Sequence, residues 1–220
     1  AAPLIDGDRC AASSGCRACV SVCPQDAYTW QDGRVAHDLD ACLPCGRCAS
    51  ACPTGAISNP SASPSMIESQ VRAIIGTAHG SVGIRFVCSR GSMSPASGLE
   101  DVLVPCTSMV PATWMLACLS LGATEARAVP CAESGCPLGL DTSADRANRL
   151  AAATLQSVGA RPDELVGLLG EGWTSPFGYF AQGGAAGLVE ALADAANSSI
   201  EVRDESAPMG LVEIDQIGRA

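Results

Sequence analysis

Apolar residues recur at helix-like and strand-like spacings from about residue 65 onward. Apolar positions three and four residues apart predict an amphipathic helix that begins at the capping box Ser65-Met66-Ile67-Glu68 and ends near Ala78. Short apolar runs predict strands over residues 82–87, 101–104 and 126–129, and the pattern predicts further helices over residues 112–121 and 142–158. Helices that alternate with short apolar strands indicate an α/β domain with a small, mostly parallel sheet.

The first 59 residues predict shorter elements. Residues 28–30 and 34–36 predict a β-hairpin, because the intervening Asp32-Gly33 pair suits a tight turn. Residues 56–58 predict one further short strand. A serine- and proline-rich linker over residues 60–65 separates this segment from the α/β domain, which we place at residues 66–160.

Cysteines in the first segment are repeated at a fixed offset. The repeated residues are Cys16, Cys19 and Cys23 in the first repeat and, 29 residues later, Cys45, Cys48 and Cys52 in the second. Cys10 and Cys42 precede the two repeats, which gives the patterns C-x5-C-x2-C-x3-C-P and C-x2-C-x2-C-x3-C-P. An internal duplication of this kind rarely arises by chance.

This spacing suits two iron–sulfur cubanes that are bound in a crossed manner. A C-x2-C-x2-C loop can wrap three thiolates around one face of a cubane, while the fourth cysteine binds the other cluster. We expect that fourth cysteine to lie at the start of a short helix, and the proline after it to turn the chain away. The predicted ligands are Cys10, Cys16, Cys19 and Cys52 for one [4Fe–4S] cluster (the first cysteine set) and Cys42, Cys45, Cys48 and Cys23 for the other (the second cysteine set).

Residues 6–59 resemble the bacterial two-[4Fe–4S] ferredoxins in these motifs. The resemblance implies an α+β ferredoxin-like cluster module, at residues 1–59, that carries electrons. One feature departs from the family pattern, since five residues separate Cys10 from Cys16 where the family usually has two. Zinc and disulfides are the competing interpretations, but zinc does not require the Cys-Pro signature and disulfides do not require a 29-residue repeat.

Four further cysteines lie near the ends of the predicted strands of the α/β domain. Cys88, Cys106 and Cys131 each come at or just after a strand, and Cys136 follows Cys131 with C-x4-C spacing (together, the third cysteine set). Because the carboxyl ends of parallel strands meet at one edge of a sheet, these thiols are expected to converge there. Four cysteines suit a [2Fe–2S] cluster, zinc accepts the same ligands, and a domain that has lost its cluster is the third interpretation.

Residues 82–150 resemble the delta subunit of methyl-viologen-reducing hydrogenases. The resemblance rests on Phe86-Val87-Cys88, on the cysteine after the next strand, on a helix that ends in Leu-Gly-Ala, and on the C-x4-C pair. It implies an iron–sulfur centre that links a hydrogenase to a flavin-containing heterodisulfide-reductase subunit. The family usually has extra cysteines after its first strand, where this chain has Ser89, Arg90 and Gly91.

The net charge and the apolar runs of the chain limit its possible partners and location. The formal net charge of −10 argues against nucleic acid and anionic membranes as partners, because both need a positive protein surface. No apolar run is long enough for a membrane span, and no signal peptide is visible, so we expect a cytoplasmic protein. Cys118 falls inside a predicted apolar helix and is interpreted as a buried thiol. Residues 161–220 form an acidic C-terminal extension that is a candidate for docking a partner.

The sequence therefore predicts an electron-transfer subunit without chemistry of its own. It contains no phosphate-binding or flavin-binding motif, so catalysis and any flavin are expected in protein partners. By resemblance these are a hydrogenase, a molybdenum or tungsten oxidoreductase, or a heterodisulfide-reductase-like flavoprotein that splits electron pairs. The alternatives are a free low-potential ferredoxin with an accessory domain and, less favoured because the chain is not basic, a redox sensor.

Overall fold

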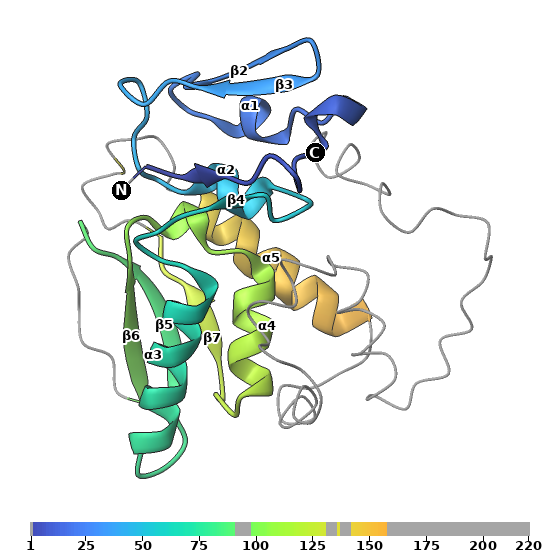
Figure 1. Ribbon diagram of the computed structural model, residues 1–220. Helices are drawn as coiled ribbons and strands as arrows, with labels where there is room; N and C mark the ends of the chain where they lie inside the picture. The colour runs from blue at the N-terminus through green and yellow to red at the C-terminus, as the bar shows by residue number, and fades with distance from the viewer. Residues whose placement is uncertain (1, 91–97, 131–135, 137–141, 158–220) are drawn as a thin grey trace.

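The computed structural model describes residues 2–90, 98–130, 136 and 142–157. Figure 1 shows two parts, a cysteine-rich N-terminal module and an α/β part whose sheet lies beneath it. The C-terminal extension over residues 161–220, the end of the α/β domain and Cys131 lie outside the described residues. Among the residues that are described, no helix has the length and apolar character needed to cross a membrane.

The N-terminal module consists of short elements joined by tight turns. In chain order they are β1 (Leu4–Ile5), the 3₁₀ helix η1 (Ala11–Ser14), α1 (Ala18–Val22), β2 (Tyr28–Gln31), β3 (Arg34–His37), α2 (Arg47–Ala51) and β4 (Ile57–Ser58). The predicted hairpin is confirmed as β2 and β3, with φ of 50° at Asp32 and 75° at Gly33, as the tight turn requires. β4 pairs with β1 in antiparallel fashion, a partner that the sequence pattern did not predict.

The α/β part contains a three-stranded parallel sheet. Its elements are α3 (Pro64–Thr77), β5 (Gly83–Cys88), β6 (Leu99–Val104), η2 (Thr107–Met109), α4 (Ala112–Ser120), β7 (Ala126–Ala128) and α5 (Thr142–Ser157). The strands lie in the order β6-β5-β7, and both strand pairs are parallel. The predicted small parallel sheet is therefore confirmed, and each predicted strand lies within about two residues of the observed one.

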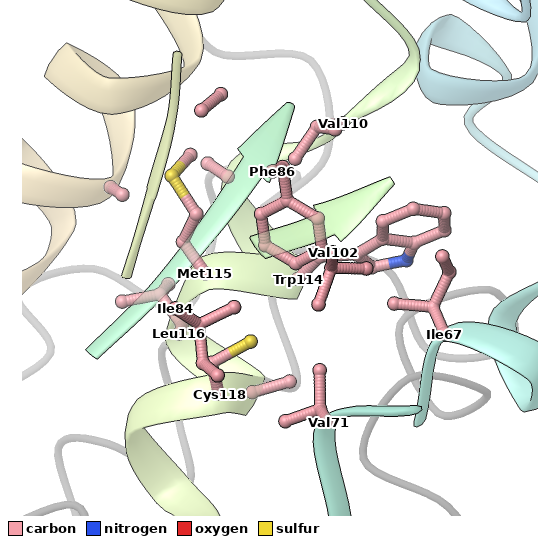
Figure 2. Packing of buried hydrophobic residues seen from close by; sticks show 14 of the residues in the cluster. Ile67, Val71, Ile84, Phe86, Val102, Val110, Trp114, Met115, Leu116 and Cys118 are labelled. Carbon is pink, nitrogen blue, oxygen red and sulfur yellow. The ribbon is translucent and has the colours of Figure 1, made fainter. Parts of the chain in front are cut away.

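The core of the α/β part is apolar and continuous from sheet to helices. Ile84 and Phe86 of β5 pack with residues of α3 and α4, as Figure 2 shows. Phe86 and Trp114 are neighbours, with ring centroids 6.0 Å apart. On the opposite face of β5, Arg85 forms a short ion pair with Asp101 of β6, with 2.7 Å between nitrogen and oxygen. Side chains of the sheet and of the helices thus share one buried core.

The start of α3 differs from the prediction. Ser63 is the N-cap, and its hydroxyl accepts a hydrogen bond of 3.3 Å from the backbone N–H of Met66. Ser65, which we expected to cap the helix, lies inside its first turn. The physical reason is Pro64, whose fixed φ and missing N–H suit the first helical position and move the cap one residue before it.

The two parts meet where α2 approaches η2. The Ser50 hydroxyl donates to the Ser108 carbonyl at 3.2 Å, and the Ser108 hydroxyl donates to the Cys45 carbonyl at 3.4 Å. Gly46 has a φ of 72°, and a Cβ atom there would come within 2.7 Å of Met109 Cβ. A glycine is needed at this position both for the backbone conformation and for the close approach.

Candidate metal centres

The first cysteine set surrounds a single cavity. Cys10, Cys16, Cys19 and Cys52 all line a hollow of about 290 Å³, which includes space open to solvent. Cys52 comes from the second repeat, more than thirty residues away from the other three in the sequence. The fold therefore brings four thiols of one predicted ligand set to one place. Four thiols around one cavity fit the donor set of a [4Fe–4S] cluster.

The long spacer between Cys10 and Cys16 has a regular structure. Its residues form η1, with Cys10 as the N-cap and Gly15 as the C-cap. Gly15 has a φ of 88°, and the N–H of Cys16 donates to the Ala11 carbonyl at 3.2 Å. The additional residues are thus taken up in one 3₁₀ turn, and Cys10 still reaches the cavity.

The fourth cysteine of each repeat does not lie where we predicted it. Cys23 is the C-cap of α1 and Cys52 is the C-cap of α2, so each stands at the end of the short helix and not at its start. The helix occupies the spacer between the third and fourth cysteines, and the following proline favours extended backbone at the cap. The change in position does not prevent crossing, because Cys52 lines the cavity of the first set.

The second cysteine set is also brought together across the repeats. Burial raises the pKa of the Cys42 thiol, and the nearby Cys45 and Cys23 thiols raise it further. Burial raises the pKa of Cys48 to about 11, with a smaller contribution from Cys45. Cys23, from the first repeat, also packs in one cluster with Cys48 of the second, together with Cys19 and Cys52. Bound iron would hold these cysteines as thiolates.

Several groups donate hydrogen bonds to the cysteine sulfurs. The Tyr28 hydroxyl donates to Cys48 Sγ at 3.3 Å, and the N–H of Ala27 donates to Cys23 Sγ at 3.3 Å. Thr54 Oγ1 lies 3.6 Å from Cys52 Sγ. Burial acts to raise the pKa of Cys52, but hydrogen bonds from Thr54 and from nearby backbone amides outweigh it and lower the pKa. The sequence reasoning missed Tyr28 and Thr54 as sulfur contacts.

The third cysteine set is only partly covered by the described residues. Cys88 ends β5, and Cys106 follows β6 at the same carboxyl edge of the sheet. Cys106 packs with Cys136 and with Cys45 of the second set. Cys88 Sγ lies 3.6 Å from the Pro105 carbonyl, and Cys131 falls outside the described residues. The contact between Cys45 and Cys106 joins the second and third cysteine sets in space.

The eight cysteines of the N-terminal module are thiols, and none of them forms a disulfide bond. Within the described part of the chain, no three His, Cys, Asp or Glu side chains are grouped so that they could share one metal ion. Cubane ligation differs from that arrangement, because each thiolate binds a different iron.

Comparison with known proteins identifies the N-terminal module. Residues 9–56 match the family described as the 4Fe-4S dicluster domain. The chain therefore has an N-terminal 4Fe–4S dicluster ferredoxin domain. The presence of this domain supports the assignment of [4Fe–4S] clusters to the module and of a role in electron transfer.

One curated relative supports the same assignment. The chain is 49% identical over 39 residues to an uncharacterized ferredoxin of Methanocaldococcus jannaschii. The aligned segment covers 18% of this chain. The chain spans about a quarter of the length of that relative (26%). No solved structure matches the chain. The matched family segment ends at residue 56, so the resemblance of residues 82–150 to a hydrogenase delta subunit stays a prediction.

Proposed function

We propose that this chain is an iron–sulfur electron-transfer subunit that relays electrons between catalytic and flavin-containing subunits of a larger oxidoreductase. The observation that carries the proposal is the single cavity lined by Cys10, Cys16, Cys19 and Cys52. A thiol from the second repeat that joins three from the first is the crossed arrangement of a dicluster ferredoxin. Two [4Fe–4S] clusters, each bound by one of the first two cysteine sets, supply one-electron transfer when bound.

The α/β part extends the proposed path. Cys88, Cys106, Cys131 and Cys136 bind a third centre, for which [2Fe–2S] is the proposed occupant. The contact of Cys106 with Cys45 supports a path from the second cysteine set to this proposed centre, since one cysteine of each set touches the other. Electron tunnelling weakens steeply with distance, so adjacent ligand shells favour transfer from the N-terminal module toward the sheet edge.

The proposed partners follow from the chain's own chemistry and from its resemblances. All the proposed groups are one-electron carriers, whereas hydrogen, formate-type substrates and hydride donors exchange electron pairs. The proposed partner is a subunit that exchanges electron pairs with its substrate and single electrons with this chain. A hydrogenase, a molybdenum or tungsten enzyme, or an electron-bifurcating flavoprotein related to heterodisulfide reductase does both.

Cysteine variants test the crossed ligation. In an oxygen-free preparation of the full chain, Cys52→Ser is expected to alter the electron paramagnetic resonance (EPR) signal of one reduced [4Fe–4S] cluster, and Cys23→Ser that of the other. Cys16→Ser and Cys45→Ser identify the two signals, because Cys16 binds the first cluster and Cys45 the second whether or not the fourth cysteines cross over. If Cys52→Ser affects the same cluster as Cys45→Ser, each repeat binds its own cluster and the crossed assignment is wrong.

The association state distinguishes the subunit from a free carrier. A relay subunit is expected to purify from native cells with redox-enzyme subunits that contain flavin, nickel, molybdenum or tungsten. A chain that is isolated alone, and that accepts and donates electrons as a monomer, is a free ferredoxin with an accessory domain. The match to a ferredoxin relative is the observation that keeps this second function in view.

A further inference from the structure

The internal repeat makes the two metal sites comparable position by position. The 29-residue offset that relates the cysteines also relates Tyr28 to Ile57 and Gln25 to Thr54. Hydroxyl groups therefore occupy non-equivalent positions in the two repeats. A difference between otherwise duplicated sites shows where the surroundings of the two clusters diverge.

Tyr28 brings a hydroxyl to the second cysteine set. Its side chain is 3% exposed, stacks on the His37 ring at a centroid distance of 4.3 Å, and donates to Cys48 Sγ at 3.3 Å. The equivalent residue in the second repeat is Ile57, which lines the cavity of the first set. An isoleucine side chain has no donor, so the first set receives no counterpart of the Tyr28 hydrogen bond.

Thr54 brings a hydroxyl to the first cysteine set. Its Oγ1 lies 3.6 Å from Cys52 Sγ, and the residue lines the same cavity. The equivalent residue in the first repeat is Gln25, whose side-chain amide donates to the Pro24 carbonyl at 3.1 Å. Each of the first two cysteine sets thus has a side-chain hydroxyl against one of its sulfurs, provided by a different position of the repeat.

We propose that Tyr28 and Thr54 are positioning residues that set the reduction potentials of the two clusters independently, Tyr28 for the second cysteine set and Thr54 for the first. The inference rests on the proposed function, because it requires both clusters to be bound. Reduction adds one electron to a cluster and increases the negative charge on its thiolates. A hydroxyl that donates to a ligand sulfur stabilises this reduced form more than the oxidised form, and so raises the potential.

The two contacts act locally for a geometric reason. A hydrogen bond affects the sulfur that accepts it far more strongly than sulfurs of the neighbouring set. Tyr28 is anchored by its His37 stack and by burial with Cys48 and Ile57, so its hydroxyl cannot swing to another acceptor. No proton moves and no covalent bond of the chain changes, and the added electron comes from the external reductant.

Two isosteric substitutions test the proposal in the full chain loaded with iron and sulfide. Tyr28→Phe and Thr54→Val each remove one hydroxyl, and Thr29→Val in the exposed part of β2 is the matched control. The readout is a dithionite titration of both clusters followed by EPR, with the signals assigned from the cysteine variants. Tyr28→Phe is expected to make the midpoint of the second-set cluster more negative and leave the other in place, and Thr54→Val is expected to do the reverse.

A second measurement covers the case in which Tyr28→Phe does not fold. The chain contains two tyrosines, so fluorinated tyrosine can be incorporated with little other change. Fluorination makes the phenol a stronger donor, and the midpoint of the second-set cluster is expected to become less negative. Thr54→Val is independent of both tyrosine experiments, since it removes a contact to a different sulfur, that of Cys52.

The outcomes separate this inference from the proposed function. Iron and sulfide at parental levels with unchanged midpoints in both variants overturn the inference, as does an equal change in both clusters from one substitution. A parent chain that binds no iron–sulfur cluster overturns the proposed function instead, before any variant is compared.

Discussion

The cysteine side chains have two kinds of surroundings. Cys118 is 0% exposed and lies in the apolar core near Leu116 and Val71, as Figure 2 shows. Burial alone raises its pKa well above the ordinary thiol value. The eight cysteines of the N-terminal module instead lie near other thiols, backbone amides or hydroxyls. Burial in apolar surroundings gives an inert thiol, whereas clustered thiols with hydrogen-bond donors suit metal.

Substitution of Cys118 tests this distinction. Cys118→Ala is expected to leave the iron and sulfide content unchanged. Cys118→Ser is expected to lower the free energy of unfolding by about 1–3 kcal/mol, because a hydroxyl is placed in a core without a partner. Denaturant unfolding and iron analysis of both variants provide the measurement. Loss of a cluster in Cys118→Ala would show that this thiol is a ligand after all.

His37 predicts a dependence of stability on pH. Burial lowers its pKa below the ordinary value of about 6.5, and its Nε2 atom is buried without a hydrogen-bond partner. The unfolded chain therefore takes up a proton more readily than the folded chain. The contribution of neutral His37 to the free energy of unfolding is fully present above about pH 6.5, and it is lost as the pH falls toward the lowered pKa.

The measurement compares unfolding of the parent chain and His37→Phe between pH 7.5 and about pH 5.5, under oxygen-free conditions. The parent is expected to lose more stability over this range than the variant, which keeps an aromatic ring against Tyr28. Equal losses in both chains would remove His37 as the cause.

At the scale of elements, the close contact between α2 and η2 depends on Gly46. Gly46→Ala forces a side chain into the left-handed region, at a cost of about 1–2 kcal/mol, and adds an overlap with Met109. We expect a lower free energy of unfolding and slower electron transfer from the N-terminal module to the cluster proposed at the third cysteine set. Gly76→Ala in α3 is the control, since open space surrounds that position and alanine favours a helix.

Stopped-flow reduction and denaturant unfolding measure the two effects. A Gly46→Ala chain as stable as the parent, with unchanged transfer rates, would show that the α2–η2 contact is unimportant for both.

Local sequence signals predicted most of these elements. The Asp32-Gly33 turn and Gly122 after α4 have the positive φ values that such positions require, so hairpin and helix end could be located in advance. β1 could not, because a two-residue strand exists only through its partner Ser58 and Ile57, some fifty residues away. The cap of α3 was misplaced because two serines compete, and Pro64 decides between them.

At the scale of the whole molecule, Cys10, Cys16, Cys19 and Cys52 line one cavity. The spacing rules assign these four to one cluster, which stays a prediction. They did not predict the packing of Cys45 against Cys106, which depends on how the N-terminal module docks on the sheet edge. Figure 1 shows this arrangement, with α2 and β4 directly above the α/β part. Long-range packing of this kind has no local signal in the sequence.

The central claim is that these thiols hold two inorganic cubanes. Iron and acid-labile sulfide counts on the full chain, purified without oxygen, test it most directly. Two bound cubanes give an expected count of about eight irons and eight sulfides per chain, and about ten of each if the third set binds [2Fe–2S]. A colourless protein without acid-labile sulfide, or one that contains zinc in place of iron, would contradict it.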